Sequence, residues 1–119
     1  MKHPVRMILL ILIAAVTAVP LFAHMKVDKS EPAANSTVTA SPSHVQVWFS
    51  QAPDIKVTKL SLTGPAGAVK LSTPKANGKS IVLNVEGQLN DGVYTAAWQS
   101  AGDDGHVQKG EFKFTVKRR

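Results

Sequence analysis

The stretch Val93-Tyr94-Thr95-Ala96-Ala97-Trp98-Gln99-Ser100-Ala101-Gly102-Asp103-Asp104-Gly105-His106 runs from a strand-like segment into a polar turn. Its first half is rich in β-branched and aromatic residues, which favour a strand, and its second half has the Gly/Asp composition of a turn. Asp104 and His106 are two positions apart, so in extended backbone their side chains leave the same face. A carboxylate and an imidazole on one face can share a metal ion, but they supply only two ligands. The other ligands would have to come from elsewhere in the chain.

On both sides of this stretch, short runs of alternating apolar and polar residues predict further strands. They lie at residues 44–50, 57–63, 68–71, 80–85 and 111–116, whereas residues 30–36 and 73–79 are expected to be turns and loops. The alternation slips within 57–63, which indicates a β-bulge there. Turn residues such as Asn77-Gly78 separate the runs. Six or seven short strands, without helical periodicity after residue 23, predict one all-β domain, an antiparallel Greek-key β-sandwich or barrel (cupredoxin-like or Ig-like).

The first 23 residues have the pattern of a signal peptide for export. A basic start that includes Lys2 and Arg6 precedes an apolar run at residues 7–16, and a small residue, Ala23, ends the segment. We therefore expect cleavage between Ala23 and His24. Since the mature chain would begin at His24, the histidine itself would carry the free α-amine.

Cleavage would leave a domain of residues 24–119, and the alternative is an uncleaved membrane anchor at residues 7–23. That anchor would be 17 residues long, which is marginal for a span of about 20. After cleavage, 12 of the 14 basic residues remain against 8 acidic ones, a net charge of +4. Apart from the tail at 117–119, the basic residues are scattered and lack aromatic interleaving, so we expect no nucleic-acid partner. We expect a monomer.

The chain contains no cysteine, so a metal site must rely on nitrogen, oxygen or thioether ligands. After cleavage, His24 can bind one metal through its α-amine and its ring Nδ1 together. His106 adds a third nitrogen and Asp104 an oxygen. A nitrogen-rich site without thiolate favours Cu(II), and we expect one ion per chain. The amine, whose usual pKa is about 8, must lose its proton to bind, so the affinity should fall on acidification.

Three further residues lie next to the expected ligands in the sequence. Asp103 adjoins Asp104 and is the alternative oxygen ligand or an outer-shell acceptor, although strand alternation turns it away from His106. Lys26 occupies the third mature position, where a different terminal copper motif requires a histidine. Met25 is the only methionine after residue 23, whereas Cu(I) sites built on thioethers need several.

On spacing alone, ordinary structural roles explain several of these residues. The carboxylates of an Asp-Asp-Gly turn commonly cap backbone N–H groups, and a lone loop histidine is commonly solvated. His44 lies on the polar face of its strand and is expected at the surface. Trp48 and Trp98 are expected to pack in the core or at an edge rather than to bind a ligand.

Several motifs occur along the mature chain: His24 followed by Val27; Ser30-Glu31-Pro32-Ala33; Ser41-Pro42 with the strand at 45–50; Asp91-Gly92-Val93-Tyr94 leading to Trp98; and Asp104-Gly105-His106 before Gly110. Together they resemble the CopC-like family of exported copper-binding proteins, named for copper resistance. The resemblance covers nearly the whole mature chain. It implies a Greek-key β-barrel or sandwich, a periplasmic location and a high-affinity Cu(II) site. Carried over by residue, that site consists of His24 through its amine and imidazole, the Asp104 carboxylate and the His106 imidazole.

Family members with a second, Cu(I) site have a methionine-rich loop between the middle strands. The corresponding region here, about residues 62–79, contains no Met and no His, so the resemblance implies a member that binds Cu(II) alone. Val107 stands where the family motif often has Pro after the second histidine. This departure bears on the rigidity of the loop and not on the ligands.

The predicted function is copper sequestration, carriage or resistance in the periplasm, with an inner-membrane copper transporter as a candidate partner and without enzyme activity. An anionic Asp ligand stabilises Cu(II) over Cu(I), which disfavours redox cycling. Two alternatives stay open. One is a metal-free Ig-like interaction module, because fold does not decide function. The other is a copper-dependent oxidase or monooxygenase that uses the terminal histidine.

Overall fold

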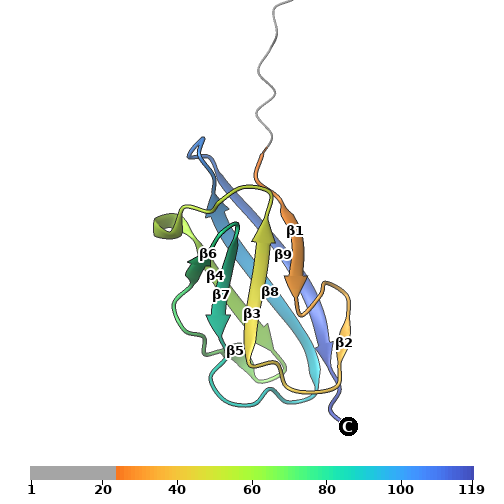
Figure 1. Ribbon diagram of the computed structural model, residues 1–119. Helices are drawn as coiled ribbons and strands as arrows, with labels where there is room; N and C mark the ends of the chain where they lie inside the picture. Colours follow the sequence, from red (N-terminus) through yellow and green to blue (C-terminus); the bar gives the residue numbers. More distant parts are fainter. Residues whose placement is uncertain (1–23) are drawn as a thin grey trace, which may run out of the picture.

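The computed structural model describes residues 24–119, which form a two-layer β-sandwich (Figure 1). The elements are β1 (Val27–Glu31), β2 (Thr37–Val38), β3 (His44–Phe49), the 3₁₀ turn η1 (Ile55–Val57), β4 (Lys59–Gly64), β5 (Gly67–Val69), β6 (Lys75–Asn77), β7 (Ser80–Asn84), β8 (Gly92–Ala101) and β9 (Val107–Val116). One sheet has the strand order β1-β3-β7-β6 and the other β2-β9-β8-β4-β5. The predicted all-β sandwich is confirmed, and the predicted signal at 1–23 lies outside the described residues. Within 24–119, no helix has the length and apolar character needed to cross a membrane.

The segment 57–63 differs from its prediction, because it contains no bulge. Strand β4 pairs with β8 in continuous register. The slip in alternation arises because Ile55–Val57 form the 3₁₀ turn, which the side chain of Asp54 caps. A shift of register occurs instead in β1, between Val27 and Lys29.

Three short strands occupy segments in which the sequence predicts no strand. β1 and β2 flank the turn-rich segment that follows residue 30, and β6 lies within the predicted loop 73–79. β2 runs parallel to β9, whereas all other pairs of the described strands are antiparallel. The turn predicted at Asn77-Gly78 is confirmed: Gly78 has φ 61°, a left-handed conformation that favours glycine, and it joins β6 to β7.

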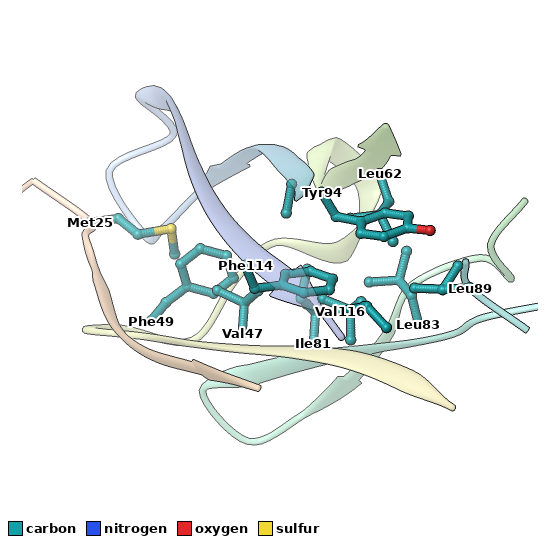
Figure 2. Close-up of a cluster of buried hydrophobic side chains, with 12 residues drawn as sticks. Met25, Val47, Phe49, Leu62, Ile81, Leu83, Leu89, Tyr94, Phe114 and Val116 are labelled. Carbon is teal, nitrogen blue, oxygen red and sulfur yellow. The ribbon is translucent and has the colours of Figure 1, made fainter. Parts of the chain in front are cut away.

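Inward-facing side chains of both sheets form one buried core (Figure 2). The largest fully buried apolar side chains are those of Phe49, Phe114, Leu62, Ile81, Leu83, Val45, Val47 and Val116. In β3 every second residue is buried, as the sequence alternation predicts. Tyr94 stacks on Phe114 with ring centroids 5.6 Å apart and donates its hydroxyl to the Asn90 carbonyl at 2.7 Å. The core therefore spans the sandwich and holds the two sheets face to face.

One end of the sandwich collects the start of β1, the end of β3 and the loop 102–106 between β8 and β9 (Figure 1). Near this end, Phe49 of β3 and Trp98 of β8 pack edge to face across the two sheets, with ring centroids 5.3 Å apart. Trp98 lies over Gly110 of β9, where a Cβ atom would come within 2.7 Å of the indole. Trp98 thus has the packing role expected of it, and the two sheets are fixed relative to each other close to the loop.

Candidate metal centre

His24 is held at this end of the sandwich by the two residues that follow it. The side chain of Met25 is 4% exposed and lies in the buried core, on the Phe49 side of the cluster in Figure 2. The backbone of Lys26 makes two hydrogen bonds with Ser50: its N–H donates to Ser50 Oγ at 3.0 Å, and its carbonyl accepts from the Ser50 N–H at 2.8 Å. His24 therefore lies next to anchored chain, although His24 itself is exposed.

The loop 102–106 carries the carboxylate and the second imidazole. Gly105 has φ 72°, which favours glycine, and its N–H donates to the Gly102 carbonyl at 3.1 Å. Asp104 Oδ1 accepts a hydrogen bond from the backbone N–H of His106 at 3.0 Å, and Asp104 Oδ2 lies 3.5 Å from His106 Nδ1. The carboxylate therefore caps the turn, as Asp commonly does, and also faces the imidazole.

The structure brings His24, Asp104 and His106 together, although more than 75 residues separate the first from the others. One possible ligand atom from each lies within 4.8 Å of the other two, and no other such group of three occurs among residues 24–119. The two imidazole rings have centroids 6.4 Å apart. Nitrogen and oxygen ligands about 2.0–2.2 Å from a shared ion lie up to about 4.4 Å apart. Small side-chain movements would therefore let the three residues bind one ion.

The site is open to solvent on the histidine side. The side chain of His106 is 69% exposed, whereas that of Asp104 is 19% exposed because its carboxylate turns in against the loop. Structural metal sites are usually closed by their protein ligands. An open site suits an ion that is taken up and released.

Other residues considered from the sequence have different surroundings. Asp103 is not part of the three-residue group, and its backbone N–H donates to Gln51 Oε1 at 3.4 Å. His44 begins β3 at the opposite end of the sandwich, where its Nε2 lies 3.7 Å from a Glu31 carboxylate oxygen. Trp48 packs under a lysine ammonium group, 4.2 Å from the ring centroid. The geometry thus favours Asp104 over Asp103 as an oxygen ligand.

Gln108 is a residue of this cluster that the sequence reasoning missed. Its Nε2 lies 3.4 Å from His24 Nδ1, the nitrogen that the predicted chelate would use. The expectation that Asp104 and His106 share one face of extended backbone is wrong, because residues 103–104 form a turn and Gly105 has φ 72°. Strand alternation starts only with β9 at Val107, so it gave no signal that links Gln108 to Asp104.

Because Met25 anchors the terminus through the core, Met25→Ala should destabilise the fold and weaken metal binding together. Large-to-small core substitutions of this kind cost about 2–5 kcal/mol in the free energy of unfolding. Met25→Leu is the matched control, since volume-conserving swaps usually cost less than about 1.5 kcal/mol. Urea unfolding measures the first effect, and a Cu(II) titration the second. Loss of copper affinity in Met25→Leu would instead indicate that the thioether is a ligand.

The chain is similar to known proteins in sequence and in structure. A family model described as the CopC domain matches residues 27–117. Protein YobA from Escherichia coli (strain K12) is 31% identical over 116 residues, which cover 94% of each chain. Copper resistance protein C from Escherichia coli is 34% identical over 106 residues, 80% of this chain and 82% of that protein. The crystal structure of PcoC, a methionine-rich copper resistance protein from Escherichia coli, superimposes with a TM-score of 0.68 and 32% identity, covering 80% of this chain and 100% of that chain.

Proposed function

Because the chain belongs to the CopC family, in which relatives are named copper resistance proteins, we propose that it binds one Cu(II) ion through His24, Asp104 and His106. The observation that carries the proposal is the convergence of two imidazoles and one carboxylate within 4.8 Å at one end of the sandwich. A metal-free interaction module has no need of such a convergence. The copper is the cargo of the protein.

Cleavage before His24 would complete the ligand set. It would place an α-amine beside the ring Nδ1, giving three nitrogens and one oxygen with Asp104 and His106, a set that favours Cu(II). Since Met25 is buried and Lys26 is hydrogen-bonded, the new amine would lie close to anchored backbone. Consecutive Cα atoms are about 3.8 Å apart, so the α-amine of His24 could move only a short distance from the anchored Met25.

The ligand types support Cu(II) rather than Cu(I). Cu(I) favours soft thioether and thiolate ligands. PcoC is described as methionine-rich, whereas this chain has no cysteine and, after residue 23, a single methionine. That methionine, Met25, has its side chain in the buried core. We therefore propose that the chain holds a Cu(II) site without a companion Cu(I) site.

We propose that the activity is binding and transfer, not catalysis. The carboxylate of Asp104 is a hard, anionic ligand that stabilises Cu(II) relative to Cu(I) and so opposes redox cycling. The test is oxygen consumption by the copper-loaded protein in the presence of ascorbate. A rate well above that of free copper would contradict this part of the proposal and favour an oxidase.

We also propose that the chain acts as a monomer in the periplasm, after removal of residues 1–23, and passes its ion to an inner-membrane copper transporter. The exposure of His106, 69% for its side chain, supports a carrier because a partner can reach the ion directly. Because the ion should bind the folded chain and not the unfolded chain, copper loading should raise the unfolding temperature of the protein.

The experiment that tests the function uses protein exported by its own signal. An intact mass establishes the N-terminus, and a Cu(II) titration followed by electron paramagnetic resonance gives stoichiometry and ligand types. We expect a chain that begins at His24 and binds one tetragonal, nitrogen-rich Cu(II). Weak, heterogeneous binding would contradict the proposal and favour the interaction module.

A further inference from the structure

We propose that Ser50 and Gln51, which directly follow β3, form a template that sets the distance between the two halves of the metal site before copper arrives. The proposal rests on the copper site proposed above and assigns these two residues a positioning role. The halves come from different sheets: His24 leads into β1 of one sheet, and Asp104 lies in the loop between β8 and β9 of the other. Pairing within either sheet therefore does not fix the gap between them.

Ser50 holds the first half. Its hydroxyl accepts the Lys26 N–H at 3.0 Å and its N–H donates to the Lys26 carbonyl at 2.8 Å. Lys26 lies two positions after His24, and both its backbone N–H and its carbonyl are thus bound to Ser50. Any movement of Ser50 would shift the segment that carries the first imidazole.

Gln51 holds the second half. Its Oε1 accepts the backbone N–H of Asp103 at 3.4 Å, one residue before the carboxylate ligand. Its side chain also lies against Gly102, where an added Cβ atom would overlap the Gln51 carboxamide. Three residues further on, the Asp54 N–H donates to the Ala101 carbonyl at 2.8 Å, which ties the same segment to the end of β8.

Two adjacent residues therefore contact the two halves, and one peptide unit, about 3.8 Å between Cα atoms, separates the contacts. A site ordered in this way loses less conformational entropy when the ion binds, because terminus and loop are already placed. Residues that orient metal ligands from outside typically change affinity by about 10–100-fold. We expect an effect near the lower end of that range for Gln51, because its hydrogen bond is long and Asp104 makes its own contacts in the loop.

The test compares variants that remove or displace the Gln51 carboxamide. Gln51→Leu keeps bulk but loses the acceptor, and Gly102→Ala pushes the intact side chain away. Each should weaken Cu(II) affinity about tenfold and broaden the electron paramagnetic resonance spectrum. Gln46→Leu is the matched control: this glutamine, on β3, is also half-buried and donates to Ser80 Oγ of β7 at 3.0 Å, away from the site. Its affinity should stay within about twofold of wild type.

A double variant separates displacement from general damage to the loop. In a Gln51→Ala background, Gly102→Ala has no carboxamide to displace and should weaken binding by less than about twofold further. A full tenfold additional loss would show that Gly102→Ala acts independently of Gln51 and would overturn the template.

A readout without metal keeps this proposal distinct from the proposed function. In the metal-free protein, exchange of the Asp103 amide proton with water, measured by nuclear magnetic resonance, should be faster in Gln51→Leu and Gly102→Ala and unchanged in Gln46→Leu. Unchanged exchange in the first two variants, or unchanged affinity where the wild type binds copper, would overturn the template. A wild-type protein that binds no Cu(II) would overturn the function instead, while amide exchange would still decide the positioning role.

Discussion

Acetylating the α-amine of His24 in the mature protein should weaken Cu(II) binding by more than the roughly 100-fold that loss of an outer-shell partner can cost. In the proposed site the amine and Nδ1 of one residue would bind the ion together, so losing the amine would also remove the chelate. An acetyl group is small and leaves the imidazole, the buried Met25 and the Lys26 hydrogen bonds in place. Affinity by competition with a chelator measures the loss, and a mass spectrum verifies that the lysines are unmodified.

The acetylated protein should also lose most of the stabilisation that copper binding gives to the fold. A ligand at 1,000 times its Kd stabilises a fold by about 4.1 kcal/mol. At the same copper concentration, a hundredfold weaker site would give about 1.4 kcal/mol. Equal copper-induced shifts in Tm for blocked and unblocked protein would contradict participation of the amine. A metal-free interaction module predicts no shift in either.

A glycine inserted before His24 tests the position of the amine rather than its presence. A Gly-His terminus can still chelate Cu(II) through its own amine, the intervening amide and the ring. We expect this variant to bind copper with a different electron paramagnetic resonance spectrum and without dependence on His106. An unchanged spectrum would show that the amine need not belong to the histidine itself.

The longer strands could be predicted from the sequence because their side chains alternate between core and solvent. β3 is the clearest case, with strict alternation of burial from His44 to Phe49. β1 has one buried residue, Ser30, which is polar, and β2 is two residues long, so neither shows a periodic apolar pattern. The 3₁₀ turn produced a local slip that resembles a bulge. Short or edge elements are thus specified by their neighbours rather than by their own residues.

The candidate site likewise has residues that could be predicted from the sequence and residues that could not. The spacing of Asp104 and His106 could be seen in the sequence, but a turn with Gly105 at φ 72° brings them together rather than the strand alternation that was expected. The approach of His24 depends on how the two sheets pack, because β1 and the loop between β8 and β9 belong to different sheets, so spacing in the sequence does not contain it. It was expected instead from the cleavage site and from family resemblance. The part played by Gln51 has no sequence signal, because it depends on a glycine backbone that the fold brings beneath it.

His106→Ala and Asp104→Ala should each reduce Cu(II) affinity by more than about 100-fold, beyond the range of outer-shell substitutions. Each change removes one of the few groups that converge within 4.8 Å. His44→Ala is the matched control: it also removes an imidazole, but at the opposite end of the sandwich beside Glu31. Its affinity should remain within about twofold of wild type. Equal losses in all three variants would contradict the assignment.

Because the Asp104 carboxylate also caps the turn, a further substitution is needed to separate its structural role from its role as a metal ligand. Asp104→Asn keeps an oxygen that can accept the His106 N–H, a bond of 3.0 Å in the native loop, but removes the charge that a Cu(II) ligand supplies. We expect thermal stability without copper close to wild type and copper affinity nearly as low as in Asp104→Ala. Asp103→Ala should have little effect, since that side chain lies outside the three-residue group. If Asp104→Asn retained full affinity while Asp103→Ala lost it, the oxygen ligand would be Asp103, and Asp104 would serve the turn alone.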